Sequence, residues 1–262
     1  MRKAIILHHQ GWTDIINCIG LVRYSCQKMG YESCILLIRE GAYELAKYIF
    51  QDIKNLTIIP KKQNDIASSS RSYLQSLKDT MKEYHRLFFG QIDRLYSGRR
   101  YKAIHHSNNS FVDNFYEKYG IDRKKRIEMY ELKRDVELEE KRYKDVVDSI
   151  GENYIVIHYE TDGHSMKYYK QNIKEMNEKH ITEEFRDLPK FNLDKCSNIF
   201  FDMIKVMENA KEIHIMESVW CAVIYLIQKR YGLLKDIPIY IHNYIRPRGL
   251  NILYPDNGWK WL

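Results

Sequence analysis

The fold is decided by one stretch near the start of the chain, Ile5-Ile6-Leu7-His8-His9-Gln10-Gly11-Trp12-Thr13-Asp14, where an apolar run gives way to a polar loop. Residues 4–8 predict a short strand, and Thr13 or Asp14 can cap a helix that runs to about residue 29. Gly30 follows as a helix stop. A strand that leads directly into a helix is the first half of a βαβ unit, so we expect an α/β protein with a parallel sheet.

The same alternation continues along both halves of the chain. In the first half the pattern predicts strands over residues 33–38, 56–59 and 101–105, and helices over 43–51, 110–119 and a segment ending near residue 85. In the second half it predicts helices over 135–150, 197–209 and 218–231, strands over 154–158, 212–216 and 237–244, and an irregular segment over 160–192. The basic segment 121–134 is typical of a connection. We therefore expect two Rossmann-like domains, residues 1–125 and residues 126–262.

The composition is that of a basic globular protein. The 262 residues carry a net charge of +7, which suits anionic ligands. The five cysteines show no zinc-type spacing and lie in apolar segments, which is typical of free thiols in a reducing compartment. No apolar stretch approaches the roughly 20 residues that cross a bilayer. We expect a cytoplasmic protein (host cytoplasm if the source is a virus) that can make peripheral contact with a membrane surface.

The first loop carries the first group of candidate site residues. It follows a strand of a parallel sheet, and ligands bind outside the carboxyl ends of such strands. Gly11 lets the backbone approach a ligand closely, and Asp14 can act as a general base, as can His8 or His9. The alternative is that Asp14 only caps the helix and the histidines pack against the fold.

A second group follows the strand that ends at His158. The loop over residues 158–167 contains Gly163, Ser165 and Lys167, whose backbone amide, hydroxyl and ammonium groups suit phosphate oxygens. A polar surface turn is the alternative interpretation.

A third group lies where the strand over residues 212–216 breaks into a helix at Glu217 and Ser218. Ser218 as N-cap leaves amides at the helix N-terminus that can bind a phosphate. Downstream, His242, Arg246 and Arg248 form a basic cluster, and Arg246 is the best candidate for a bidentate phosphate contact. Simple capping and a solvated arginine are the alternatives.

Several motifs are absent from the sequence. It contains no G-x-G-x-x-G, no P-loop, no G-x-S-x-G and no H-E-x-x-H. It also contains no Asp-x-Asp, the spacing by which many sugar-nucleotide enzymes hold a divalent metal on a diphosphate. A diphosphate would therefore depend on helix N-termini and cationic side chains.

These pieces together resemble a glycosyltransferase of the GT-B class, in which two Rossmann-like halves face each other across a cleft. Residues 7–16 look like the G-x-G-D-type opening of the bacterial heptosyltransferase family, where the aspartate is the proposed base. Residues 212–223 resemble the donor-binding strand-to-helix segment of that family and of the fucosyltransferases. The chain also resembles small glycosyltransferase-like proteins of viruses and bacteria in several short sequence patterns. The residues of these patterns are Phe115, Tyr116, Tyr119, Gly120, Ile121, Arg134, Asp135, His242, Tyr244, Arg246 and Trp259.

The resemblance implies a metal-independent, cofactor-free and inverting transfer of a sugar from a nucleotide-diphosphate donor to a hydroxyl of a glycan or glycoconjugate. The first domain would be the acceptor side, with Asp14 as the first choice of base and His9 as the second. The second domain would bind the donor, and the donor-binding residues implied are Gly11, His158, Gly163, Ser165, Lys167, Glu217, Ser218 and Arg246. The chain departs from the heptosyltransferases in having only Gly11 where they have two glycines, and Glu217 where they carry aspartate.

The rival interpretation is a non-enzymatic protein. The basic surface and the 21 tyrosines would then contact nucleic acid or another polyanion. The transferase interpretation expects no nucleic-acid partner, and it leaves the sugar, the nucleotide, the acceptor and the oligomeric state open.

Overall fold

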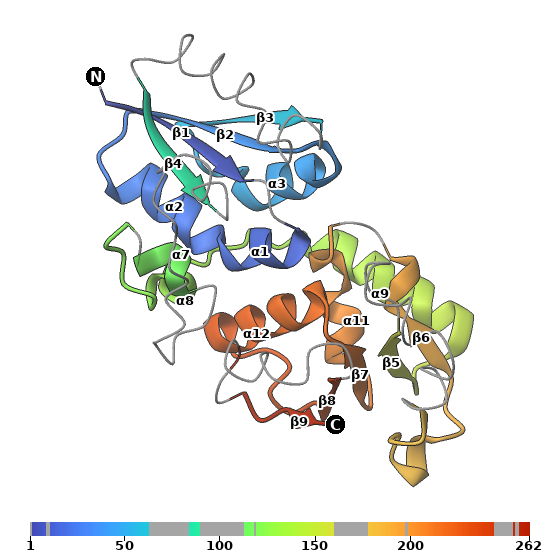
Figure 1. Ribbon diagram of the computed structural model, residues 1–262. Coiled ribbons are helices and arrows are strands. Elements are labelled where there is room, and N and C mark those ends of the chain that lie inside the picture. The colour runs from blue at the N-terminus through green and yellow to red at the C-terminus, as the bar shows by residue number, and fades with distance from the viewer. Residues whose placement is uncertain are drawn as a thin grey trace. The chain divides into compact units, whose positions relative to one another are not determined.

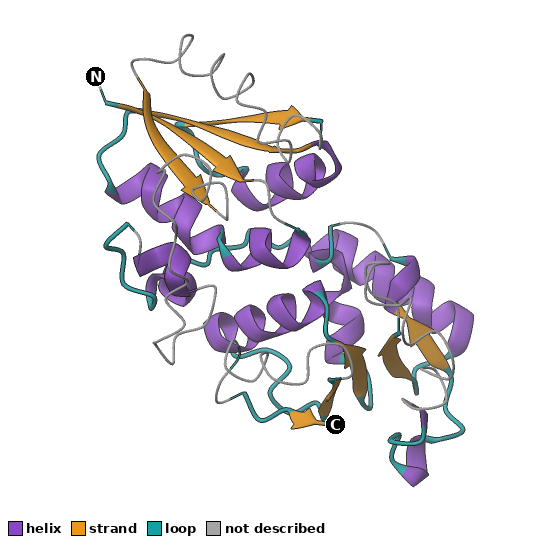
Figure 2. Ribbon diagram, viewed as in Figure 1, coloured by secondary structure: helices purple, strands orange, loops and turns teal. Residues whose placement is uncertain are grey.

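The computed structural model describes residues 2–8, 11–62, 84–89, 113–117, 119–159, 178–196, 199–243, 254 and 257–262. The chain divides into two compact units, Met1–Lys133 and Arg134–Leu262 (Figure 1). Each unit contains a parallel β-sheet with helices, so the predicted α/β class is confirmed (Figure 2). The predicted boundary at residue 125 falls within α8, Lys125–Glu128, which packs against α2 of the first unit.

The first unit is built on a sheet with the strand order β3-β2-β1-β4, in which every pairing is parallel. Its strands are β1 (Lys3–His8), β2 (Ser33–Arg39), β3 (Leu56–Lys61) and β4 (Tyr84–Phe89). The helices before β3 are α1 (Trp12–Asn17), α2 (Ile19–Lys28), the short η1 (Glu40–Ala42) and α3 (Tyr43–Phe50). The strands predicted over residues 33–38 and 56–59 are confirmed. The helix predicted to end near residue 85 is wrong at that end, because β4 begins at Tyr84 and pairs with β1.

The first predicted helix is broken in two at Cys18. In a regular helix the amide of Leu21 would donate to the carbonyl of Asn17. Here the hydroxyl of Tyr116 lies between them: it accepts from the Leu21 amide at 3.1 Å and donates to the Asn17 carbonyl at 2.9 Å. Tyr116 belongs to α7 (Asp113–Glu117), within the helix predicted over residues 110–119. A hydroxyl inserted into the hydrogen-bond ladder is a recognised cause of a helix break.

The segment predicted as a connection, residues 121–134, belongs to the first unit up to Lys133 and contributes to its core. Ile121, Arg126 and Tyr130 are buried, and Arg126 donates a hydrogen bond to the side chain of Asn17. Its basic residues predicted a connection between domains, but Arg126 is buried and bonds to a partner inside the fold.

The second unit has a sheet of order β6-β5-β7-β8-β9, again with parallel pairings throughout. The strands are β5 (Ile155–His158), β6 (Lys190–Asn192), β7 (Ile213–Met216), β8 (Ile239–His242) and β9 (Lys260–Trp261). The helices among its described residues are α9 (Val136–Ile150), α11 (Ile204–Glu208) and α12 (Val219–Tyr231), with the short turns η3 (Glu183–Phe185), η4 (Leu193–Lys195) and η5 (Phe201–Met203). Strand β6 lies in the segment predicted to be irregular, so that prediction is wrong there.

The C-terminal end docks on the fold, as its aromatic residues predict. Trp259 is buried, and its indole Nε1 donates to the side-chain oxygen of Gln228 on α12 at 2.7 Å. The amide of Leu262 donates to the carbonyl of Ile241 in β8 at 2.9 Å.

The start of α9 is also confirmed, because the Asp135 side chain accepts from the Leu138 amide at 3.0 Å. No helix in the described part of the chain is long and apolar enough to cross a bilayer.

The two faces of the second sheet have different neighbours. Residues paired in register on adjacent parallel strands point to the same face, and their neighbours along the strand point to the other. Ile157, His214 and Tyr240 therefore share one face, on which Ile181 packs with Ile155 and Met216. His158 and Ile215 share the opposite face, where His158 meets Trp220 of α12.

Gly20 is the position where α2 and α8 touch backbone to backbone. A Cβ at this position would lie 2.4 Å from the carbonyl oxygen of Lys125, closer than atoms can approach. We expect Gly20→Ala to lower the free energy of unfolding by about 1–3 kcal/mol, because α8 must move away. Urea denaturation measures this. Gly41→Ala is the matched control, since its Cβ would meet nothing within 4 Å, and equal losses in both variants would contradict the close contact.

Candidate functional site

The carboxyl ends of β5, β7 and β8 form the candidate site of the second unit. The register pairs His158 with Ile215 and Met216 with His242, so these strand ends lie along one edge of the sheet. Open parallel sheets bind ligands outside this edge. Helix α12 starts from the same edge, immediately after β7.

Ser218 caps α12, as the sequence predicts. Its backbone is extended, with φ −149° and ψ −172°, and its Oγ accepts a hydrogen bond from the Trp220 amide at 3.2 Å. The helix has 13 residues, long enough for its aligned peptide dipoles to place partial positive charge at this end. Glu217, at the junction before the cap, is buried. The helix N-terminus at the carboxyl edge is thus a place where an anion is stabilised.

His158 lies beside this helix start and is buried. Its Nδ1 contacts Oδ1 of Asp194, and its ring stands edge-on to Trp220 at 6.5 Å between centroids. Asp194 is a residue that the sequence analysis missed. It lies in the turn η4, just after the segment predicted to be irregular and before the helix predicted over residues 197–209. The local signal is Asn192, whose side chain accepts from the Asp194 amide at 2.9 Å.

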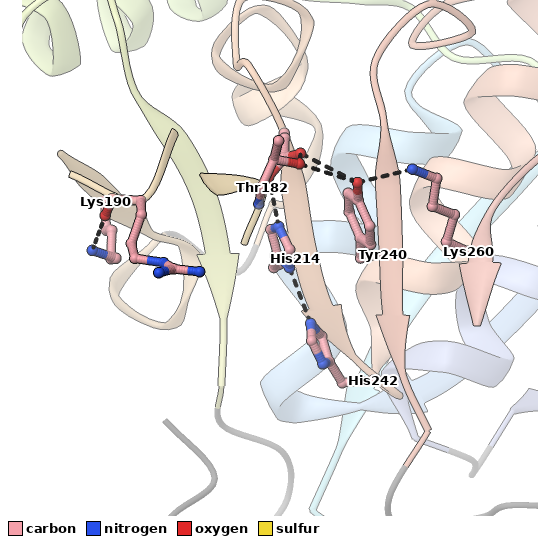
Figure 3. A network of polar contacts seen from close by, with 8 residues as sticks. Thr182, Lys190, His214, Tyr240, His242 and Lys260 are labelled. Atoms are coloured by element: carbon pink, nitrogen blue, oxygen red, sulfur yellow. Dashed lines mark hydrogen bonds and ion pairs between the residues drawn. The ribbon is translucent and has the colours of Figure 1, made fainter. Parts of the chain in front are cut away.

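A chain of buried polar side chains crosses the other face of the sheet (Figure 3). Nε2 of His214 lies 3.1 Å from Oε2 of Glu212, and Nδ1 of His214 lies 3.1 Å from Nε2 of His242. All three side chains are almost fully buried. A third histidine, His180, lies against His242 with ring centroids 5.8 Å apart.

Glu212 is held from several directions. Both the amide and the hydroxyl of Thr182 donate to its carboxylate, the amide at 3.2 Å, and the Tyr240 hydroxyl donates at 3.2 Å. Tyr240 in turn accepts from Lys260 Nζ at 2.9 Å, and its ring stacks on His214 with centroids 4.5 Å apart. Burial by itself raises the pKa of Glu212, but the hydrogen bonds from Thr182 and His214 outweigh it and hold the pKa below its usual value.

The protonation states in this chain follow from these contacts. A carboxylate only accepts hydrogen bonds, so Nε2 of His214 carries a hydrogen. Burial lowers the pKa of His214 below its usual value, which leaves the ring neutral and makes its Nδ1 an acceptor. His242 must then donate from Nε2. Burial first, and then the neighbouring His214 and His180, lower the pKa of His242 to about 3.

His242 was predicted as part of a basic cluster, and the structure corrects this. With its pKa near 3, its imidazole is neutral at physiological pH and contributes no positive charge to the carboxyl edge. The sequence showed a histidine beside two arginines, but the burial that removes its charge depends on packing in three dimensions. Arg246 and Arg248, the other members, lie outside the described residues.

The first loop is described only in part. The side chain of His8 and all of His9 lie outside the described residues, whereas Gly11 and Asp14 are described. Neither Thr13 nor Asp14 is the helix cap: α1 begins at Trp12 with Gly11 as its N-cap, and no side chain caps it. Asp14 therefore lies inside the first turn, where the helix dipole favours its negative charge.

The remaining predicted donor residues, Gly163, Ser165 and Lys167, also lie outside the described residues. Among the residues that are described, no cluster of His, Cys, Asp or Glu has the arrangement of a metal site.

Comparison with known proteins identifies the fold. No protein-family model matches the sequence, and a search of curated proteins finds no match. Among solved structures, the family 9 glycosyl transferase of Veillonella parvula matches with a TM-score of 0.57 at 9% identity, covering 100% of this chain and 86% of that one. The ADP-heptose LPS heptosyltransferase II of E. coli matches with a TM-score of 0.53 at 10% identity, covering 100% and 90%. The resemblance to this group is confirmed at the level of the fold.

The buried histidines make the stability of the fold depend on pH. In the folded chain His242 has a pKa near 3, whereas an unfolded histidine titrates near 6.5. Below about pH 6.5 the histidine binds a proton in the unfolded chain but not in the folded chain. The free energy of unfolding therefore decreases as the pH is lowered from about 6.5 to the folded pKa. For His242 alone we expect a loss of about 2 kcal/mol between about pH 6.5 and about pH 5, measured by urea denaturation.

His242→Asn tests this assignment, because an amide keeps a polar side chain but does not titrate in this range. The variant should lose much of the wild-type slope below about pH 6.5. His180→Asn is the matched control, since His180 is only half-buried and should account for less of the slope. An unchanged slope in His242→Asn would show that His242 is already protonated in the folded protein.

Proposed function

We propose that this protein is a glycosyltransferase that moves a sugar from a nucleotide-diphosphate donor to a hydroxyl group of a glycan or glycoconjugate, without a metal ion and with inversion. One observation carries the proposal: the capped N-terminus of α12 and the buried His158 lie together at the carboxyl edge of the second sheet. The fold that the chain shares with sugar transferases is consistent with it.

The chemistry of such a transfer fits this edge. As the bond from the sugar to the donor breaks, negative charge grows on the leaving diphosphate. Amides at a helix N-terminus are already oriented toward that charge, so they stabilise it without reorganising. Ser218 fixes where the helix begins, and therefore where its amides point.

The acceptor side needs a base for the attacking hydroxyl. Asp14 is the first candidate, because its carboxylate lies in the first turn of α1, next to the loop that follows β1. It is neither buried nor fully exposed, so it can exchange a proton with a ligand. His9 is the second candidate.

Two substitutions of Ser218 separate anion binding from helix capping. Aspartate and asparagine are both good N-caps, so we expect Ser218→Asp and Ser218→Asn to fold with similar stability. Only the aspartate adds a negative charge where the diphosphate would bind. UDP, GDP or ADP should raise the melting temperature of the wild type and of Ser218→Asn, and a nucleotide at about 100 times its Kd adds about 2.7 kcal/mol of stability. The shift should be lost in Ser218→Asp.

The same thermal measurement separates the enzyme from its rival. A polyanion-binding protein would respond to oligonucleotides, with a steep dependence on salt, and not to mononucleotides. A melting temperature that only oligonucleotides raise would contradict the transferase proposal.

Asp14→Asn tests the base. Removing a general base typically slows a reaction by about 10²–10⁴-fold, so we expect a loss of that size in sugar transfer, with the melting temperature little changed. Transfer is followed by release of the nucleoside diphosphate from the donor that shifts the melting temperature most. Glu44→Gln is the matched control, because Glu44 is an exposed acid in the first turn of α3. Full activity in Asp14→Asn would exclude Asp14 and leave His8 or His9.

A further inference from the structure

The pair formed by His158 and Asp194 lies on the face of the second sheet opposite to the Glu212–His214–His242 chain. Both side chains are more than nine-tenths buried, with 9% and 6% of their surfaces exposed. The Nδ1 atom of His158 lies against Oδ1 of Asp194, without the geometry of a regular hydrogen bond.

Asp194 fixes which nitrogen of His158 carries the hydrogen. A lone pair on Nδ1 would face the negative carboxylate and be repelled, so Nδ1 carries the hydrogen and a neutral ring has its lone pair on Nε2. The carboxylate is itself held in place, because its Oδ2 accepts from the Tyr159 amide at 3.2 Å. The amide of Asp194 also donates to Asn192 at 2.9 Å.

The other ring nitrogen is the unusual atom. Nε2 of His158 is buried and has no hydrogen-bond partner among the residues that the structure describes. Its surroundings include the Trp220 ring, which in turn packs edge-on against Phe200 at 5.2 Å. A buried polar atom without a partner is unfavourable and rare, so this atom is a candidate for contact with a ligand.

Charged groups lie around the edge at which a diphosphate would meet His158. Asp194 on η4 contacts the ring directly, and Glu217 follows the end of β7, the strand that pairs with β5. The further ion pair of Arg142 with Asp202, at 3.2 Å, is internally neutralised. A diphosphate at this edge would therefore meet carboxylates and the α12 dipole, and a positive charge on His158 would lie between two anions.

We propose that His158 takes up a proton when a diphosphate binds, and that the resulting imidazolium donates a hydrogen bond from Nε2 to a phosphate oxygen while Asp194 holds Nδ1. The proton comes from solvent and adds to the Nε2 lone pair, and it returns to solvent when the ligand leaves. Asp194 is a positioning residue in this arrangement. The inference rests on the proposed donor site and adds that binding there is coupled to a proton.

Isothermal titration calorimetry measures this coupling directly. Inorganic pyrophosphate, ADP, UDP and GDP are titrated into the full chain at neutral pH in two buffers of different ionisation enthalpy, and the difference in apparent enthalpy gives the protons exchanged. The pyrophosphate arm separates the diphosphate chemistry from recognition of the nucleoside. We expect the wild type to take up a proton that His158→Gln does not. Protons released by the phosphates themselves are common to both proteins and cancel in the comparison.

Binding should weaken as well as lose its proton. His158→Gln keeps a hydrogen-bond donor but no charge, so we expect an affinity about 10- to 100-fold lower, the effect of losing one charge-assisted hydrogen bond. Asp194→Asn still accepts from the Tyr159 amide, yet it lacks the negative charge, and should show reduced proton uptake. His180→Gln, on the opposite face of the sheet beside His242, is the matched control and should match the wild type.

A measurement on the wild type guards against variants that fail to fold. Two-bond ¹⁵N–¹H correlation spectra of the histidine rings report the tautomer, and His158 should carry its hydrogen on Nδ1 in the unliganded protein. The opposite tautomer, or diphosphate binding with equal proton exchange in the wild type and His158→Gln, would overturn the inference and leave the transferase proposal standing. Binding of neither pyrophosphate nor any nucleotide would overturn both.

Discussion

The parallel pairing of β7 with β5 on one side and β8 on the other is the constraint on which the second unit depends. Parallel neighbours bring all their carboxyl ends to one edge, and the register then decides which side chains share a face. His158 and His242 therefore reach the same edge from opposite faces of the sheet. A shift of one residue in the pairing of β7 would turn His214 toward α12. His214 would then no longer meet Tyr240 and His242.

That register is reinforced by polar contacts as well as by the backbone ladder. Burying a carboxylate is costly unless it is fully hydrogen-bonded, and Glu212 is supplied by Thr182, Tyr240 and His214 from three separate segments. Removing one partner would leave a buried charge poorly satisfied, which costs more than the hydrogen bond itself contributes. The contacts thus act together: β7, β8 and the segment before η3 hold one another in place through a single carboxylate.

Much of the fold could be predicted from the sequence because its strands are short apolar runs that lead into amphipathic or apolar helices. The strands β1, β2, β3, β5 and β7, and the helix α12 with its Ser218 cap, all have this form. Strand β6 has only three residues, Lys190–Asn192, and no apolar periodicity, while β4 follows a segment with a helical pattern. The local sequence pattern does not reveal a strand that is defined by its pairing with a strand distant in the sequence.

The candidate site was predictable to a smaller degree, for a related reason. Ser218 and His158 could be found because each directly follows or ends a recognisable strand. Asp194 could not, because its contact with His158 joins residues from two different strand ends. Glu212 and His214 alternate within a predicted strand, a sign that one face of it is polar, but only the register shows that this face meets Tyr240 and His242.

The two histidines at the carboxyl edge differ in the charge that they can carry. His242 contacts the neutral ring of His214, to which its Nε2 donates, and burial keeps the pKa of His242 near 3. His158 contacts the carboxylate of Asp194 instead. An anion at this edge would therefore meet one histidine that is paired with a carboxylate and, in our proposal, takes up a proton, and one that stays neutral. Because the neutral one belongs to the chain that holds β7 and β8 together, charging His158 need not disturb the register on which the edge depends.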